Sequence, residues 1–235
     1  MIIDVSHHNG EIEWSKTGKH IDYAILRCGY GTNTNQQDDK TFNYNATQCE
    51  KYGIPYGVYI YSYATTIHQC HSEIDHILRC VKNRKIVLPL YYDIEEQSTF
   101  TNGAPRTFAS LFLYRVRQAG YKAGLYSNDV NYRGYFNELR PDSAWVARYS
   151  DNEPKSNYDI WQYTSRGSVP GITGSVDLSV RKDPLGFINL TYDSIVDDVL
   201  ANNYGTGIHR KNALYNIGIN YWYIQNLVNK RLRGE

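Results

Sequence analysis

Two carboxylates, Asp93 and Glu95, stand two residues apart in the segment LYYDIE, residues 90–95. Residues i and i+2 of a β-strand point to the same face, so we expect both side chains to project together from a strand end. Two carboxylates this close cannot both ionise freely, and the pKa of one of them should rise. A carboxylic acid that stays protonated is the group that protonates the leaving oxygen when a glycosidic bond is cleaved. The alternative is a chance spacing that serves as a calcium ligand or a solvated strand end.

Two further acids stand in comparable positions. Asp4 ends the first predicted strand, and Asp177 lies in the segment SVDLS, residues 175–179. In barrel-like α/β folds, reactive groups gather at the C-terminal ends of the strands. The sequence therefore predicts that Asp4 and Asp177 join Asp93 and Glu95 around one mouth.

Short apolar or alternating runs recur along the chain, with helix-like segments between them. This alternation is typical of a mainly parallel α/β sheet, and we predict a barrel-like one. Gly53 and Gly120 stand just past two predicted helices, where a left-handed residue is expected. The predicted strands are 2–5, 23–28, 56–61, 87–94, 123–126, 144–147 and 159–163, and the predicted helices are 40–52, 67–82 and 105–119.

The pattern changes near the segment DPLG, residues 183–186. No strand signal follows it, and the spacing predicts three short helices over about 193–202, 209–216 and 221–232. A bundle of this size folds best with a neighbour. We therefore expect a barrel domain over residues 1–187 and an appended three-helix module over residues 190–235.

Composition argues against several classes of partner. The 235 residues carry a formal net charge of +1, which gives no electrostatic reason to expect nucleic acid or a membrane. No run approaches the ~18 apolar residues of a membrane-spanning helix. The chain opens with a predicted strand and shows no signal peptide, so we expect synthesis in the cytoplasm. There are 23 Tyr against 6 Phe, and these amphipathic rings suit a sugar-binding cleft as well as a core.

Seven short motifs occur in one order: DVS (4–6), GIPYGVY (53–59), DIE (93–95), LYSN (125–128), WVARY (145–149), WQY (161–163) and DLS (177–179). As an ordered set they resemble the glycoside hydrolase family 25 lysozymes over about residues 1–187. The resemblance implies a flattened, incomplete TIM-like α/β barrel. It also implies an N-acetylmuramidase, which cleaves the β-1,4 bond between N-acetylmuramic acid and N-acetylglucosamine in peptidoglycan.

The resemblance also implies roles for the four acids. Glu95 is the expected general acid, and Asp93 is the neighbour that raises the pKa of Glu95 and stabilises charge. Asp93 is also suited to hold the substrate's acetamido group while its carbonyl attacks the anomeric carbon, as in substrate-assisted glycosidases. Asp4 and Asp177 are expected to shape the field of the site or to position substrate. Direct attack by water stays open as the other course.

A set of aromatic and amide side chains is expected to line the glycan groove, because aromatic faces pack against the C–H surfaces of pyranose rings. Core packing is an equally good explanation for each of the aromatic ones. The candidates are Tyr61, Tyr63, Tyr126, Trp145, Trp161 and Gln162.

The tail carries IVDDVL (195–200), YGTG (204–207) and a basic residue, Arg210. These features resemble the three-helix cell-wall-binding repeats of some phage lysins, which bind the disaccharide–peptide unit of peptidoglycan. Arg210 and Tyr204 are the expected ligand contacts, and a solvated charge is the alternative for Arg210. One copy is present, so binding is expected to be weak or to depend on a homodimer formed through this module. Together these features suggest a phage or prophage endolysin, which reaches the cell wall after release through a separate membrane pore.

One cluster carries a weaker signal. His76 and Cys80 stand four residues apart on a predicted helix, a spacing that can bind zinc. Cys70 on the same helix falls on the apolar stripe, where a free cysteine behaves as a small hydrophobe. We therefore expect no metal and no organic cofactor. For the whole chain, the main alternatives to a muramidase are a catalytically silent peptidoglycan-binding protein and a glycosidase of other specificity, such as an N-acetylglucosaminidase or chitinase.

Overall fold

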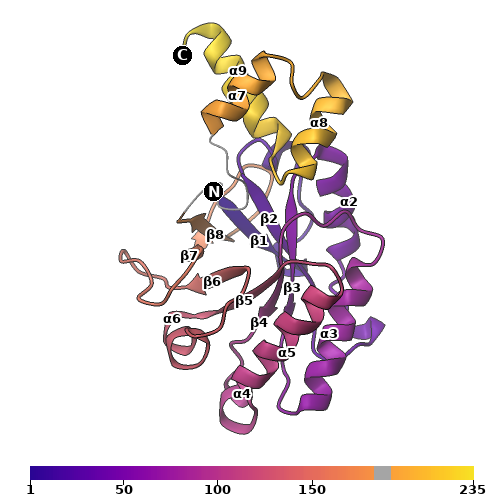
Figure 1. The fold of residues 1–235 in the computed structure, drawn as a ribbon, viewed down its shortest axis with the longest axis vertical. Coiled ribbons are helices and arrows are strands. Elements are labelled where there is room, and N and C mark those ends of the chain that lie inside the picture. Colours follow the sequence, from indigo (N-terminus) through magenta and orange to yellow (C-terminus); the bar gives the residue numbers. More distant parts are fainter. Residues whose placement is uncertain (183–191) are drawn as a thin grey trace.

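The computed structural model describes residues 1–182 and 192–235. Its centre is a closed barrel of eight strands in sequence order (Figure 1). Neighbours from β1 to β7 are parallel, whereas β8 is antiparallel to both β7 and β1. The strands are β1 Ile2–Val5, β2 Tyr23–Tyr30, β3 Tyr56–Tyr61, β4 Leu90–Asp93, β5 Ala123–Asn128, β6 Ser143–Ala147, β7 Ile160–Gly167 and β8 Val176–Arg181.

Alternation along each strand divides the core into an inner and an outer layer. On β4, Tyr91 points into the barrel, where it packs with Ile25 and Trp145. Its neighbour Tyr92 packs outside and stacks on Phe112 with 4.7 Å between ring centroids. Strands β1, β2, β4 and β6 are buried on both faces along nearly their whole length, which is typical of parallel strands covered by other elements.

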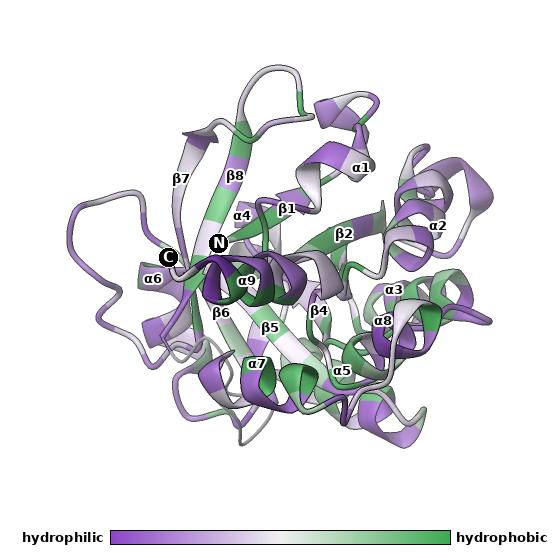
Figure 2. Ribbon diagram, turned by 90° about the horizontal axis from the view of Figure 1, so that it is seen from above, coloured by the Kyte–Doolittle hydropathy of each residue, from purple (hydrophilic) through white to green (hydrophobic). Residues whose placement is uncertain are grey.

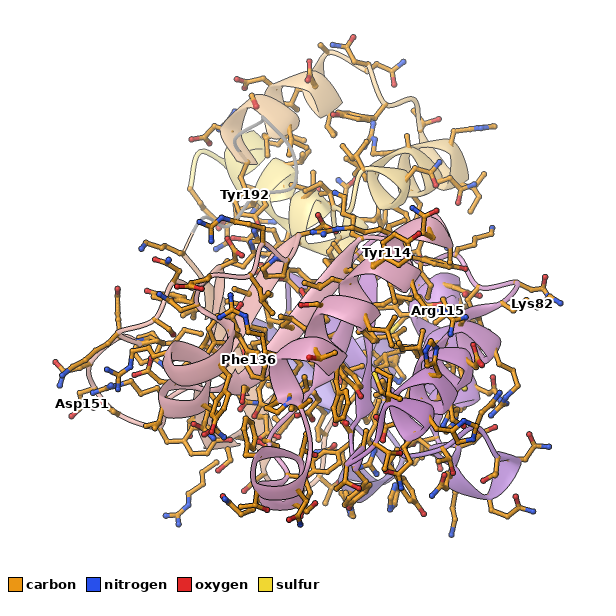
Figure 3. The ribbon with its side chains drawn as sticks, turned by 60° about the horizontal axis from the view of Figure 1, so that its bottom comes forward. Lys82, Tyr114, Arg115, Phe136, Asp151 and Tyr192 are labelled. Carbon is orange, nitrogen blue, oxygen red and sulfur yellow. The ribbon has the colours of Figure 1, made fainter. Side chains whose placement is uncertain are left out.

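Helices cover one side of the barrel. α2 Phe42–Tyr52, α3 Ile67–Val81 and α5 Pro105–Gln118 pack outside β2 to β5 (Figure 1). A capping box between Thr66 and Gln69 begins α3. On the surface, Arg115 of α5, which Figure 3 labels, pairs with Asp75 of α3 at 2.9 Å. The shorter helical elements are η1 His7–Asn9, α1 Trp14–Thr17, η2 Asn35–Gln37, α4 Gln97–Asn102, α6 Asp129–Asn131 and the π-turn η3 Tyr132–Phe136.

The helical layer is incomplete, as expected. Residues 148–159, between β6 and β7, and residues 168–175, between β7 and β8, contain no helix. The barrel prediction is thus confirmed, as are the three long helices. Gly53 and Gly120 both have the expected positive φ, 70° and 88°.

Strands β4 and β8 and helix α4 differ from the sequence prediction. The fourth strand is shorter than predicted, covering 90–93 rather than 87–94. Pro89 limits it, because proline has no N–H to donate to a ladder. Strand β8, which carries Asp177, was not among the predicted strands, and neither was helix α4. The antiparallel β8 lies between Gly174 and the segment 183–186, so its local signal is short.

Three helices follow the barrel and form their own small core: α7 Tyr192–Leu200, α8 Gly207–Asn216 and α9 Tyr221–Arg233. They dock on the end of the barrel where the parallel strands begin (Figure 2). The Asn220 amide nitrogen donates to the carbonyl oxygens of Gly18 (2.8 Å) and Ile21 (2.7 Å). The Tyr215 side chain packs into the outer core of the barrel. The predicted boundary at 187–190 lies outside the described residues.

No helix in residues 1–182 or 192–235 has the length and hydrophobicity of a membrane span.

Candidate active site

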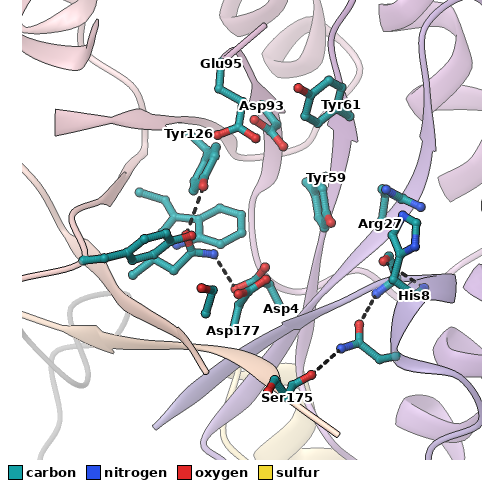
Figure 4. Close-up of a pocket in the computed structure, with 16 residues that line it drawn as sticks. Asp4, His8, Arg27, Tyr59, Tyr61, Asp93, Glu95, Tyr126, Ser175 and Asp177 are labelled. Atoms are coloured by element: carbon teal, nitrogen blue, oxygen red, sulfur yellow. Dashed lines mark hydrogen bonds between the residues drawn. The ribbon is translucent and has the colours of Figure 1, made fainter. Parts of the chain in front are cut away.

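A cavity of about 370 Å³ opens at the C-terminal ends of the parallel strands. The four acids singled out by the sequence all line it (Figure 4). Asp4 comes from β1, Asp93 ends β4, and Glu95 follows two residues later. Asp177 lies near the start of β8, which reaches the same mouth because β8 runs antiparallel to its neighbours. The structure therefore brings together acids from three strands and one loop.

Asp93 is held between two tyrosines. It is the register partner of Tyr61 on β3 and of Tyr126 on β5. Its side chain is buried, and its Oδ1 atom has no hydrogen-bond partner among the described residues. Burial raises the pKa of Asp93, and the nearby charges of Glu95 and Asp4 raise it further. An unpartnered buried carboxylate oxygen that lines a cavity is available to a ligand.

Glu95 is only partly buried, and its pKa is also raised. Burial is the main cause, and the negative charges of Asp177 and Glu96 add to it, while the nearby hydroxyl group of Tyr126 opposes it. A raised pKa keeps the Glu95 carboxyl protonated at higher pH than an exposed glutamate. Such a group can donate a proton to a leaving oxygen.

Asp4 and Asp177 form the second pair of acids. They are direct partners in the antiparallel pairing of β1 with β8. Burial raises the pKa of Asp4, and the charge of Asp177 raises it further. Burial raises the pKa of Asp177 too, while its hydrogen bond with Asp4 opposes that rise. Two such carboxyls are most stable when they share one proton.

Gln162 connects this pair to the aromatic wall. Its Oε1 atom accepts hydrogen bonds from the hydroxyls of Tyr126 (3.0 Å) and Tyr149 (2.9 Å). Its Nε2 atom then faces Asp4 and donates to Oδ1 at 2.9 Å (Figure 4). The chain of bonds fixes the orientation of the amide and of both tyrosine hydroxyls. Gln162 is therefore an anchoring residue of the cavity wall.

Tyr61, Tyr126 and Trp145, three of the candidates for the glycan groove, line this cavity. The Tyr61 hydroxyl donates to Glu96 at 2.9 Å. Trp145 is 1% exposed, and its indole N–H donates to Ser179 at 3.1 Å. The ring of Trp145 therefore forms the floor of the cavity rather than an open stacking face.

Two of the predicted groove residues do not line this cavity. Tyr63 is 48% exposed and lies beside Tyr61, with 5.0 Å between ring centroids. Trp161 precedes Gln162 on β7, so the two side chains point to opposite faces of the strand. The Trp161 indole donates to the carbonyl of Arg148 at 2.8 Å. Contact of Tyr63 or Trp161 with a glycan stays a prediction.

Several residues that line the cavity were not predicted from the sequence. Tyr59 stands two residues before Tyr61 on β3, so the strand periodicity could have indicated it. Arg27, by contrast, had no recognisable signal. Its guanidinium is held by the buried Asp39 at 2.9 Å, and its charge lowers the pKa of Asp93. His8 is the other basic residue that lines the cavity. Burial lowers its pKa, and the charges of His7 and Arg27 lower it further.

The sequence matches the family Glycosyl hydrolases family 25 over residues 3–172, most of the barrel. The chain belongs to glycosyl hydrolase family 25. It is a peptidoglycan hydrolase of the lysozyme type. Residues 193–232 match a second family, the CW_7 repeat, which covers the three C-terminal helices.

The chain is also similar to proteins of known sequence or structure. The uncharacterized protein YegX of Escherichia coli O157:H7 is 30% identical over 189 residues, which span 76% of this chain and 68% of that protein. The catalytic domain of endolysin ply40 from bacteriophage P40 of Listeria monocytogenes has a TM-score of 0.67 and 25% identity, over 77% of this chain and 92% of that one. The autolysin LytC of Streptococcus pneumoniae, solved with a synthetic peptidoglycan ligand, has a TM-score of 0.63 and 27% identity, over 76% of this chain and 45% of that one.

The two residues expected to bind the cell wall both make contacts inside the family 25 enzyme's C-terminal module. The Arg210 guanidinium donates to the carbonyl of Gly205 at 2.9 Å and to Oε1 of Gln225 at 3.1 Å. Arg210 thus ties the loop before α8 to α9. Tyr204 packs against the small core of the module. Both side chains keep partial exposure, and their binding role stays a prediction.

Proposed function

We propose that this family 25 enzyme is an N-acetylmuramidase, which cleaves the β-1,4 bond between N-acetylmuramic acid and N-acetylglucosamine. The observation that carries the proposal is the pair of carboxyls at the mouth of the barrel. Glu95 is partly exposed with a raised pKa, and Asp93 is buried with an unpartnered oxygen. These two environments suit two different tasks at one glycosidic bond.

In the proposed reaction, Glu95 donates its proton to the glycosidic oxygen as the bond to the anomeric carbon breaks. Asp93 Oδ1 accepts a hydrogen bond from the N–H of the substrate's acetamido group. That bond holds the acetamido carbonyl oxygen close to the anomeric carbon, where it attacks and forms a cyclic intermediate. Water then opens the intermediate and gives its proton to the Glu95 carboxylate, which restores the acid.

The second pair, Asp4 and Asp177, has a supporting role in this proposal. The negative charge that they share stabilises the positive charge that develops on the sugar ring. Direct attack by water is the alternative course, and the pair would then orient that water through Asp4 and Gln162. The bond that is cleaved is the same in both courses.

The C-terminal module, residues 190–235 in the proposed division, is assigned to wall attachment. Arg210 and Tyr204 remain the proposed ligand contacts, and a homodimer through this module remains a hypothesis that light scattering can test. The enzyme would act at the bacterial cell wall after release, as an endolysin does. Its catalytic cleft and its module lie at opposite ends of the barrel, so the two can contact different parts of the wall at once.

The deciding experiment is digestion of purified peptidoglycan, followed by reduction of the soluble products with borohydride and mass spectrometry of the reduced sugar. Muramitol at the new ends supports the muramidase. Glucosaminitol would keep a glycosidase and overturn the bond assignment. If no new reducing ends form while wall binding persists, the chain is instead a catalytically silent binding protein.

A further inference from the structure

A group of three metal-binding side chains lies outside the catalytic cleft. Asp38 follows η2, and His76 and Cys80 lie one turn apart on α3. One ligand atom from each of the three lies within 4.8 Å of the others. Two separate segments of the chain therefore bring oxygen, nitrogen and sulfur donors to one point.

The imidazole of His76 is fully buried and has a defined orientation. Its Nδ1 atom lies 3.1 Å from the carbonyl oxygen of Gly31, and its Nε2 atom lies 2.8 Å from Oδ1 of Asp38. A carbonyl only accepts, so Nδ1 carries a proton. With the proton on Nδ1, the lone pair of Nε2 faces an oxygen of the Asp38 carboxylate. Two such electron-rich atoms at this distance need a cation between them. That cation is either a second proton or a metal ion, and a backbone carbonyl on Nδ1 is the usual partner of a metal-bound histidine.

The backbone is shaped around this imidazole. The pairing of β2 with β3 shifts register between Arg27 and Gly29, which leaves Cys28 as the extra residue of a bulge. Gly29 then lies directly against the ring, because a Cβ at Gly29 would be 2.7 Å from Cε1 of His76. An isolated bridge between Gly29 and Asp38 brings the carboxylate to the same place.

Cys80 supplies the sulfur donor, and its side chain is partly exposed to solvent. Its Sγ atom is 4.0 Å from Oδ1 of Asp38. The same sulfur lies 3.9 Å from the backbone carbonyl oxygen of Cys28, at the bulge of β2. Asp38 and Cys80 also line a surface cavity of about 360 Å³, which gives an ion a route to the site. Arg79 faces the group as well and holds both carboxylate oxygens of Asp38: Nη1 donates to Oδ2 at 3.0 Å and Nη2 donates to Oδ1. An ion at Oδ1 would displace the second of these hydrogen bonds and leave the first.

We propose that Asp38, His76 and Cys80 bind a Zn²⁺-type divalent ion. Zinc takes nitrogen, sulfur and carboxylate ligands in a tetrahedron, at about 2.0–2.3 Å from the ion. That geometry separates the donors from one another by about 3.3–3.7 Å. The Asp38–His76 pair, now 2.8 Å apart, would have to open slightly, while the Cys80–Asp38 pair, now 4.0 Å apart, would close.

Such an ion would also support one side of the catalytic cleft. Asp38 precedes Asp39 in the chain, and the Arg27–Asp39 ion pair positions the guanidinium that lines the cleft. The ion would therefore hold the segment that carries this aspartate against α3. The sequence alone offered the His76–Cys80 spacing, and it disfavoured zinc because Cys70 of the same helix falls on the apolar stripe. The fold adds Asp38, which lies 38 residues before His76.

The test uses the full chain without an affinity tag, under a phosphine reductant, after dialysis against a chelator. Titration with Co²⁺ should give one equivalent of binding, with a thiolate-to-cobalt charge-transfer absorption that Zn²⁺ abolishes by displacement. Cys80→Ser should remove the charge-transfer absorption. Asp38→Asn, at a partly exposed side chain that leaves the core intact, should weaken Zn²⁺ binding at least tenfold in competition with a chromophoric chelator.

The matched control is Cys70→Ala, which removes another cysteine of the same helix and should leave cobalt binding unchanged. Zn²⁺ at saturation should also raise the melting temperature of the wild type and of Cys70→Ala, but not that of Cys80→Ser. A wild type that gives no charge-transfer absorption would overturn the proposal. So would an absorption that persists in Cys80→Ser. Neither result would affect the muramidase assignment, because the reduced-sugar assay does not involve this cluster.

Discussion

Asp4 and Asp177 face each other as register partners where β1 and β8 close the barrel. This contact places two acids at one side of the cleft, and Asp93 and Glu95 lie at another (Figure 4). The two pairs are electrostatically linked, because Asp177 raises the pKa of Glu95 and Asp4 raises the pKa of Asp93. The closing strand therefore tunes the acid on which catalysis is proposed to depend.

Removing the charge of Asp177 should lower the pKa of Glu95. Since the acid must be protonated, the alkaline limb of the pH–rate profile of Asp177→Asn should move to lower pH. The measurement is the rate of cleavage of a soluble glycan fragment across pH. Asp151→Asn, in the exposed loop between β6 and β7, is the control and should keep the wild-type limb. An unmoved limb in Asp177→Asn would exclude this coupling.

Removing the acid itself should abolish turnover. Glu95→Gln keeps the size and polarity of the side chain but cannot donate a proton from a carboxyl, so kcat should fall by at least about a hundredfold. Wall pull-down should be unchanged, because the module lies at the other end of the barrel. Glu96→Gln is the matched control. Glu96 accepts a hydrogen bond from Tyr61 and is not the proposed acid, so its loss should cost much less.

Asp93→Asn should slow the enzyme and stabilise it. The amide cannot replace the carboxylate in holding the acetamido group, so kcat should fall by more than about tenfold. The fold should gain stability at neutral pH, because the charge of Asp93 is buried without a hydrogen bond on Oδ1. Each kcal/mol gained raises the melting temperature of a chain of this size by about 2–4 °C.

The pH dependence of that stability gain has a defined sign. The pKa of Asp93 is raised in the folded state, so folded Asp93 holds its proton to higher pH than the unfolded chain does. The stability that this group contributes is therefore present at acidic pH and is lost as pH rises through the folded pKa. Asp93→Asn should accordingly have a higher melting temperature than the wild type near neutral pH. Near about pH 4, where aspartate in the unfolded chain is also protonated, the two melting temperatures should be equal. A gain of equal size at both pH values would contradict this account.

Wall attachment should depend on Arg210. Arg210→Ala removes the hydrogen bonds to Gly205 and Gln225, along with the proposed ligand contact, so pull-down with purified walls should weaken. Cleavage of short soluble fragments should be spared. The control is Arg231→Ala, which removes an exposed arginine of the same module paired with Asp193 and Asp197. If the two variants bind walls equally well, Arg210 has no special part in attachment.

The barrel was largely predictable because its signals are local. The run 56–61 predicts a strand, and the apolar residues of 67–81 recur every 3.6 residues, which predicts a helix. Strand β8 was not, because an antiparallel strand between a glycine turn and the end of the barrel carries only a short run of its own. The strand forms by pairing with β1 and β7, so it depends on contacts between segments that are far apart in the sequence or lie across a turn.

The candidate site divides in the same way. The sequence by itself singled out the candidate acids, since Asp93 and Glu95 stand two residues apart where a strand ends. Only the tertiary structure decided which partners surround them, namely Asp177 beside Asp4, Gln162 between two tyrosines, and Arg27 held by Asp39. The same is true of Asp38 beside His76. The physical reason is that charge, burial and hydrogen bonding act through space, so a group's pKa and contacts depend on residues that the chain brings close only when the barrel closes.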